Sequence, residues 1–255
     1  MSLKISLVVI SKNEARSLRK MLTSVVDIVD EVILVDSGST DETLAIANEF
    51  SARVYLQEWL GFGPQKRYAV AQARNDWVLC LDGDEVLSPL LHEILQSLTP
   101  ANNVSGFNLV RCNKFLGRYL RHGAGYPDYC LRLFNRKHAN WSNDLVHEAV
   151  QVSSGKIITL KGDLLHDSCD SLKSYLNKQA NYTDIQAQNL FKQKKPCKRT
   201  KLYFSPLFHF LKYYILKLGF LDGIPGFIHI VIGMQNSFNK YAKLYALYQE
   251  EQNEI

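Results

Sequence analysis

Four short apolar runs in the first 85 residues place the strongest constraint on the fold. They cover residues 4–10, 31–35, 53–57 and 76–81, and amphipathic stretches lie between them. Strands of a parallel sheet are buried on both faces, so they read as continuous apolar runs, and a helix usually joins each strand to the next. The pattern therefore predicts an α/β domain in which helices cover a parallel sheet.

Helix-start signals fall between these runs. Ser39 followed by Glu42 fits a capping box, in which each side chain bonds a backbone N–H of the first turn. Pro64 suits the first position of a helix, where its missing N–H costs nothing, and Ser88 with Pro89 is expected to open another helix.

The rest of the chain divides into a mixed region and a helical region. Further strands are expected at residues 106–111, 129–135, 146–152 and 156–160. The helical pattern begins near residue 171, with helices expected over 171–194, 202–218 and 227–249. We therefore expect a first domain of residues 1–170 and a helical C-terminal region of residues 171–255.

The cysteines and the apolar stretches bear on the compartment. The five cysteines are odd in number and form no CxxC pair, which argues against a zinc ribbon and against a secreted disulfide framework. A reducing cytosol is the expected compartment. No window reaches the roughly 20 apolar residues of a spanning helix, so we expect contact with a membrane at most, without crossing.

Positive charge is concentrated in one segment. Between Asp184 and Asp222 there is no acidic residue, yet eight lysine and arginine residues occur there. This excess indicates either a polyanionic neighbour or a solvated helix face. Large apolar side chains interleave with these cations: Tyr203, Phe204, Leu207, Phe208, Phe210, Leu211, Tyr214, Ile215 and Leu218. The mixture suits an anionic membrane surface, or alternatively a helical dimer or domain interface; no motif supports nucleic-acid binding.

Polar and acidic residues follow the predicted strands. The first strand is followed by Ser11, Asn13 and Glu14, the second by Asp36, and the fourth by the Asp82-Gly83-Asp84 triplet. Ligands of open α/β sheets bind beyond the carboxyl ends of the strands, so these residues are expected to form one site. A helix cap or a solvated loop is the alternative for each residue taken singly.

Asp82 and Asp84 carry the sharpest chemical signal. Two carboxylates one residue apart repel each other unless a cation or protons lie between them, and Mg²⁺ or Mn²⁺ suits that role when a diphosphate supplies further oxygens. A solvated turn is the alternative. Neither GxGxxG nor GxxxxGK[ST] occurs, which removes the main support for a dehydrogenase or a P-loop ATPase. Instead, Asp36 and the backbone after the first strand are the candidates for holding a nucleotide.

Three segments together carry a family resemblance. They read ISLVVISKNE at 5–14, VILVDSGSTDET at 32–43 and WVLCLDGDE at 77–85. This combination resembles glycosyltransferase family 2. Shorter matches extend along the chain at 126–128, 132–134, 146–148, 165–166 and 219–223. With these, the chain looks similar to the lipopolysaccharide-core β-1,4-glucosyltransferases of Gram-negative bacteria.

The resemblance implies a GT-A fold, a Rossmann-like mixed sheet that is flanked by helices and binds a nucleotide sugar, here with a helical C-terminal extension. It also implies inversion at the anomeric carbon and a divalent metal. On the matching positions Asp36 would contact the uracil, Asp82 the ribose or the metal, and Asp84 the metal. Lys66 and Arg67 lie where related enzymes carry basic residues near the donor. Because Glu85 adjoins the pair of aspartates, the identity of the metal ligand stays open.

An inverting displacement needs one base to take the proton of the acceptor hydroxyl. The resemblance points to Glu148 as this base, with Asp144 as the second choice. The alternative for Glu148 is that it is an ordinary surface residue of a strand. His166 and His147 are candidates for the metal shell or the diphosphate, or else are buried, hydrogen-bonded histidines.

These inferences lead to one functional hypothesis. The protein is expected to transfer glucose from UDP-glucose to a heptose of the lipopolysaccharide inner core. It would act as a peripheral enzyme on the cytoplasmic face of the inner membrane. Whether it forms homo-oligomers is left open. The alternatives are another family 2 activity, such as transfer to polyprenyl phosphate, and a sugar-nucleotide-binding or membrane-docking protein without catalysis.

Overall fold

The computed structural model describes residues 3–144, 148–167 and 171–253. The chain forms two compact units. The first consists of Met1–Arg111 and Asp128–His166, and the second of Cys112–Pro127 and Asp167–Ile255. The segment 112–127 thus belongs to the helical unit although it interrupts the sheet-forming part of the sequence.

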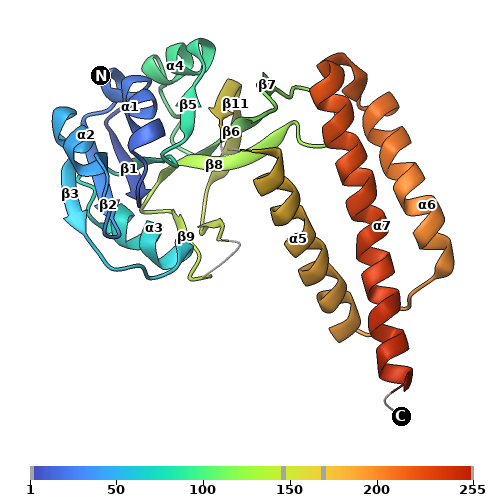
Figure 1. Ribbon diagram of the computed structural model, residues 1–255. Helices are drawn as coiled ribbons and strands as arrows, with labels where there is room; N and C mark the ends of the chain where they lie inside the picture. The colour runs from blue at the N-terminus through green and yellow to red at the C-terminus, as the bar shows by residue number, and fades with distance from the viewer. Residues whose placement is uncertain (1–2, 145–147, 168–170, 254–255) are drawn as a thin grey trace. The chain divides into compact units, whose positions relative to one another are not determined.

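A mixed sheet organises the first unit (Figure 1). Its parallel half has the order β3-β2-β1-β4, formed by Arg53–Leu56, Glu31–Asp36, Ile5–Ser11 and Trp77–Cys80. The sheet continues through β8, β6, β11 and β5, which are Asp128–Asn135, Val104–Phe115, Lys156–His166 and Glu85–Leu87. Strand β8 runs antiparallel to β4 and to β6, and β5 runs antiparallel to β11. The predicted parallel strands are therefore confirmed, and the sheet is mixed rather than purely parallel.

Successive residues of the central strands face two different cores. Leu7 and Val9 of β1 belong to the core that also contains side chains of α1 (Ala15–Thr23), α2 (Thr43–Glu49) and α4 (Pro89–Gln96). Val8, between them, belongs to the core that contains side chains of α3 (Phe62–Ala71). Burial on both faces explains why these strands read as unbroken apolar runs.

A short 3₁₀ turn, η1 (Val26–Ile28), leads into β2, and a two-stranded sheet lies beside α3. That small sheet pairs β9 (Ala139–Trp141) with β10 (Val150–Val152) in antiparallel register, so that Trp141 faces Val150. The strand expected over 146–152 is shorter in the structure, where β10 begins at Val150 and Glu148 precedes it. Residues 145–147 lie outside the described part of the chain.

The helix-start predictions have mixed outcomes. Ser88 caps α4, since its hydroxyl accepts the N–H of Leu91 at 3.4 Å, as expected. The capping box at Ser39 is wrong. Helix α2 begins at Thr43, and the Ser39 hydroxyl instead donates to the buried Asp36 carboxylate. Pro64 is the third residue of α3 rather than its first.

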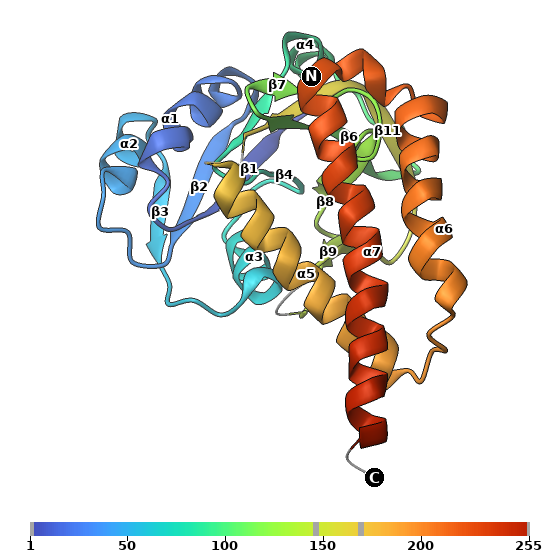
Figure 2. The same cartoon turned by 45° about the vertical axis from the view of Figure 1, so that its right-hand side comes forward.

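The second unit is mostly helical. It contains α5 (Leu172–Lys192), α6 (Arg199–Phe210), the π turn η2 (Leu211–Leu216), the 3₁₀ turn η3 (Gly219–Asp222) and α7 (Gly223–Asn253), with the short strand β7 (Arg118–Tyr119) paired to the end of β6. Helix α7 packs against both α5 and α6, as Figures 1 and 2 show. Within the described residues, no helix alone has the length and apolar character of a membrane span, although α6 with η2 and η3 with α7 meet those criteria as a pair bent by 74°.

Replacing Ser88 with Ala should lower the free energy of unfolding by about 1 kcal/mol, because the α4 cap is lost. The Ser88 hydroxyl also accepts the N–H of Asp163 at 3.0 Å, so β11 loses a contact as well. Ser97, at the other end of α4, only donates to helix carbonyls, and Ser97→Ala is the matched control. Urea denaturation measures both variants, and equal losses would contradict the capping role.

Candidate active site

A cavity of about 440 Å³ lies beyond the carboxyl ends of β1 and β4. Its lining residues come from the end of β1 and the loop after it, from the loop after β4, and from the start of α3 with the segment before it: Ile10, Ser11, Lys12, Glu14, Trp59, Phe62, Asp82, Gly83 and Asp84. Four of the predicted residues, Ser11, Glu14, Asp82 and Asp84, thus share one cavity. This is the arrangement expected when the ends of neighbouring parallel strands meet at one edge.

Asp36 organises the loops beside this cavity from a buried position. Its Oδ1 accepts the N–H groups of Gly38 and Ser39 at 2.9 and 2.8 Å, and its Oδ2 accepts the hydroxyls of Ser11, at 3.1 Å, and Ser39. Asp36 is fully buried and does not line the cavity. Its contact with a uracil stays a prediction, whereas its role in holding the ends of β1 and β2 together follows from these bonds.

Asn13 fixes the turn that follows β1. Its φ is 57°, in the left-handed region that asparagine tolerates better than most residues. Its N–H donates to the Ser39 hydroxyl at 2.8 Å, and its side-chain oxygen accepts the N–H of Thr40 at 2.8 Å. Asn13 is exposed and next to the cavity-lining Lys12, so contact with a donor stays a prediction.

Glu14 lies close to the aspartate loop. A Cβ at Gly83 would be only 3.2 Å from the Glu14 Cγ, so a glycine allows the two loops to approach each other. Burial raises the pKa of Glu14 above its ordinary value, the negative charges of Asp84 and Asp82 raise it further, and the hydrogen bond from Ser17 opposes both. Glu14 therefore holds a proton more readily than an exposed glutamate does.

Asp82 is neutralised by cations of the protein itself. Its Oδ1 lies 3.1 Å from the Lys66 Nζ, and its Oδ2 accepts a hydrogen bond of 2.7 Å from Arg132. Burial alone would raise the pKa of Asp82, but these two cations outweigh it and hold the pKa well below its usual range. Lys66 and Arg132 thus offset part of the repulsion expected between Asp82 and Asp84, and the divalent metal stays a prediction.

Lys66 connects Asp82 to Glu148. Its Nζ lies 3.0 Å from the Glu148 Oε1 and 4.5 Å from the centre of the Trp141 ring, and the residue is only 6% exposed. Helix α3 comes close enough for these contacts because Gly63 faces the backbone that follows β9; a Cβ there would be 2.4 Å from the Ser142 carbonyl oxygen. The predicted base and the predicted donor ligand therefore share one ammonium group.

Arg132 is a buried cation to which the sequence analysis assigns no role. It donates to the Glu85 Oε1 at 2.6 Å as well as to Asp82, and Arg111 lies 3.7 Å from the same Glu85 oxygen. Glu85 also accepts the N–H of Asp82 at 3.0 Å. Glu85 is therefore committed to bonds inside the protein, which leaves Asp84 as the better candidate for a metal.

Asp84 pairs with His166 across the sheet edge. The His166 Nε2 lies 3.3 Å from the Asp84 Oδ2, and both side chains are mostly buried. The described residues contain no cluster of three or more acidic, histidine or cysteine side chains placed to hold a metal ion. Mg²⁺ and Mn²⁺ sites that include a substrate diphosphate need only one or two protein ligands, and the oxygen and nitrogen offered by this pair fit that requirement.

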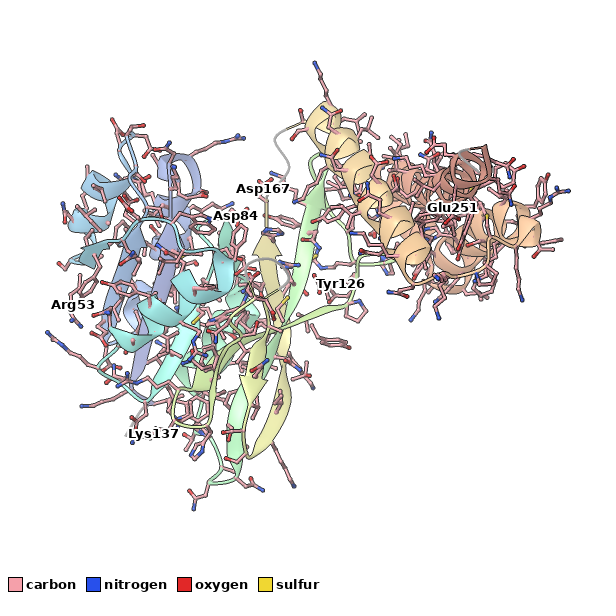
Figure 3. The ribbon with its side chains drawn as sticks, turned by 90° about the horizontal axis from the view of Figure 1, so that it is seen from below. Arg53, Asp84, Tyr126, Lys137, Asp167 and Glu251 are labelled. Carbon is pink, nitrogen blue, oxygen red and sulfur yellow. The ribbon has the colours of Figure 1, made fainter. Side chains whose placement is uncertain are left out.

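Arg67 contacts a different part of the first unit from Lys66. It donates to the Trp141 carbonyl oxygen at 2.7 Å and lines a second cavity of about 390 Å³ with Arg136 and Lys137. Strand pairing places Asn135 beside Trp77, at the start of β4, and Figure 3 shows Asp84 and Lys137 on different sides of the first unit. The structure does not bring Arg67 to the cavity of Asp82, and its donor role stays a prediction.

Two aromatic residues of the cavity were missed by the sequence analysis. Trp59 and Phe62 form an edge-to-face pair with ring centres 4.8 Å apart, and they are 49% and 46% exposed. Both residues follow β3, and this position at the end of a parallel strand was the signal in the sequence that could have identified them.

Asp144, the second choice for the base, is exposed, and its carbonyl oxygen accepts the N–H of Gly63. His147 lies outside the described residues.

Comparison with known proteins defines the class. Residues 6–158 match the family described as Glycosyl transferase family 2. The chain is 34% identical to an uncharacterized glycosyltransferase of Rickettsia prowazekii, over 99% of this chain and 90% of that protein. It is 28% identical to a lipopolysaccharide core biosynthesis glycosyltransferase of Rhizobium meliloti, over 95% and 92% of the two chains.

A solved structure supports the fold. The mannosyltransferase of Pyrobaculum calidifontis, determined with GDP-Man and Mn²⁺, superposes with a TM-score of 0.51 at 14% identity, over 98% of this chain and 76% of that one. The mixed sheet with its flanking helices is thus a GT-A fold, as expected. The chain belongs to glycosyltransferase family 2 and is a glycosyltransferase.

The ion pairs of Asp82 predict a pH dependence of stability. A carboxylate whose pKa is lowered by folding stabilises the protein above its unfolded pKa, about 3.9 for Asp, and this contribution disappears as the pH falls toward the folded pKa. The difference in unfolding free energy between the wild type and Asp82→Asn should therefore be constant from pH 8 to about pH 5 and shrink below about pH 4. Urea denaturation at a series of pH values measures it. A difference that grows on acidification would contradict these pairings.

Proposed function

We propose that this glycosyltransferase moves glucose from UDP-glucose to a heptose of the lipopolysaccharide inner core with inversion at the anomeric carbon. The observation that carries the proposal is the ion pair between Lys66 and Glu148, which holds a carboxylate beside the Asp82 end of the cavity. The cavity supplies room for a donor, and Glu148 supplies a base.

The donor would occupy the cavity with its diphosphate next to Asp84. A divalent cation bound there supplies charge that stabilises the departing diphosphate. Asp84 and His166 are the residues that would hold it, and Asp82 would face the ribose. The exposed rings of Trp59 and Phe62 offer apolar surfaces against which the donor can pack. Glu14, with its raised pKa, can donate a hydrogen bond while protonated.

Glu148 would take the proton from the acceptor hydroxyl. The freed oxygen then forms a bond to the anomeric carbon from the face opposite the leaving group, and the bond from that carbon to the diphosphate oxygen breaks, so UDP leaves with the electron pair. One carboxylate suffices for such a single displacement. The Lys66 ammonium, 3.0 Å away, keeps the Glu148 side chain in position.

The acceptor part of the proposal has separate support. The Rhizobium meliloti relative is described as a lipopolysaccharide core biosynthesis enzyme, and it aligns over nearly the whole of this chain. Glucose, UDP and heptose come from the motif resemblance. A cytoplasmic site is part of the proposal, and the odd number of cysteines without a CxxC pair suits a reducing compartment.

A donor screen tests the reaction. With truncated lipooligosaccharide that ends in heptose as acceptor, we expect nucleotide release from UDP-glucose in the presence of Mn²⁺ or Mg²⁺, and at least about a 100-fold loss after chelation by EDTA, since electrostatic stabilisation of the leaving group disappears. Asp84→Asn should reproduce that loss, whereas Asp27→Asn, an exposed aspartate on η1, should not. Turnover only with another sugar nucleotide would contradict the glucose assignment.

Glu148→Gln should lower kcat by about 10²- to 10⁴-fold, because the base is lost while the shape of the side chain is retained. The KM for the donor should change little. Glu93→Gln, an exposed glutamate on α4, is the control. Wild-type kcat in Glu148→Gln together with a loss in Asp144→Asn would transfer the role of base to Asp144.

A further inference from the structure

The second unit exposes a continuous series of large apolar side chains. They lie on α6, η2, η3 and the first turns of α7, and Tyr203, Leu216 and Ile224 are 73%, 73% and 75% exposed. We call this surface the apolar ridge. Its residues are Tyr203, Phe204, Leu207, Phe208, Leu211, Ile215, Leu216, Leu218, Phe220, Leu221, Ile224 and Phe227. Scattered apolar residues on a surface are normal, but a series of this density marks an interaction site.

The part of the ridge on α6 lies on the side of that helix that faces away from α7. The inner side of α6 is fixed by two contacts, because Ser205 bonds Ser237 at 2.7 Å and a Cβ at Gly233 would be 2.4 Å from the His209 ring. Tyr203, Leu207 and Leu211 recur every four residues on the opposite side, as one stripe of a helix does. Figures 1 and 2 both show α6 running alongside α7. The ridge is therefore left uncovered by the described part of its own unit.

The turn at the end of the ridge is firmly held. Asp222 is 2% exposed, and it accepts the N–H of His122 at 2.8 Å and faces the His122 ring nitrogen at 3.1 Å. Arg118 donates to the Leu221 carbonyl oxygen at 3.0 Å, and Gly123 donates to that of Lys217 at 2.9 Å. The segment 112–127 thus braces η3 within the second unit. The apolar side chains stay exposed on a braced turn rather than on a loose loop.

Positive charge borders the ridge, and no exposed negative charge interrupts it. Lys198 and Arg199 are exposed at the start of α6 and Lys217 at the end of η2, whereas the Lys201 Nζ lies 5.4 Å from the centre of the Tyr241 ring of α7. No acidic residue occurs between Asp184 and Asp222, and Asp222 is buried. Apolar residues flanked by lysines are typical of helices that lie in a membrane interface, where the side chains enter the acyl region and the cations meet anionic head groups.

We propose that the apolar ridge docks the protein onto a lipid surface that carries anionic head groups, with α6 lying along that surface. The charge decides between a membrane and a second copy of the chain. A two-fold dimer pairs one surface with itself, so these cations would face a surface that offers no exposed acidic residue between Asp184 and Asp222. A lipid surface with negative head groups complements both the apolar side chains and their cationic border. The proposal is independent of the sugar and of the acceptor.

Vesicle sedimentation of the full-length protein, without donor or acceptor, tests the docking. We expect binding to vesicles of phosphatidylcholine with 30% phosphatidylglycerol, and at least about tenfold weaker binding to pure phosphatidylcholine, since the lysines lose their counter-charges. Phe208→Ser with Ile215→Ser should weaken binding to the anionic vesicles by about tenfold or more, because two apolar side chains no longer enter the lipid. Lys198→Gln with Lys217→Gln, which removes two exposed cations, should also weaken it and reduce its dependence on salt.

Matched controls come from the first unit. Ile157 and Ile158 are 45% and 44% exposed on β11, and Ile157→Ser with Ile158→Ser should leave vesicle binding unchanged. Lys156→Gln with Lys161→Gln is the control for charge. Circular dichroism confirms that each variant keeps its helices. Equal binding by wild type and the Phe208/Ile215 variant would overturn the proposal. So would a dimer, measured by analytical ultracentrifugation, that the same variant dissociates while vesicles bind neither form.

Discussion

The Lys66 ammonium is the charge on which the active site depends. It lies between Asp82, which follows β4, and Glu148, which precedes β10, and it joins two carboxylates that would repel each other at this separation. Arg132 neutralises the other oxygen of Asp82. Because Asp82 is paired inside the protein, Asp84, which lines the cavity, is the carboxylate proposed for an external cation, and Lys66 keeps Glu148 close to Asp82.

The rest of the fold places these groups. Parallel strands β1, β2 and β4 bring three loops to one edge, and Asp36 links the loops of β1 and β2 through the hydroxyls and N–H groups it accepts. The close approach of α3 at Gly63 delivers Lys66. Trp141 then lies against both cations, with its ring centre 4.5 Å from the Lys66 Nζ and 5.8 Å from the Arg132 guanidinium carbon. A small displacement of α3 would separate the Lys66 ammonium from the carboxylates of Asp82 and Glu148.

The sequence predicted the parts of the site that follow from local pattern. Buried strands leave unbroken apolar runs, so the residues Ser11, Glu14, Asp82 and Asp84 that follow or end these strands could be assigned to one edge. The bridge from Lys66 to Glu148 joins residues far apart in the chain through an antiparallel hairpin, and no periodic pattern records such a contact. The capping box at Ser39 failed because the buried Asp36 competes for the same hydroxyl. The helices of the second unit were predicted from periodicity, but nothing local indicated that residues 112–127 pack with them.

A crystal structure with UDP-glucose and Mn²⁺ tests the central claim most directly. The account predicts the diphosphate in the cavity between Glu14 and Asp84, with the metal on Asp84 and the anomeric carbon open to attack from the Glu148 side. A nucleotide bound outside that cavity, with the contacts of Lys66 to Asp82 and Glu148 facing no substrate atom, would contradict it.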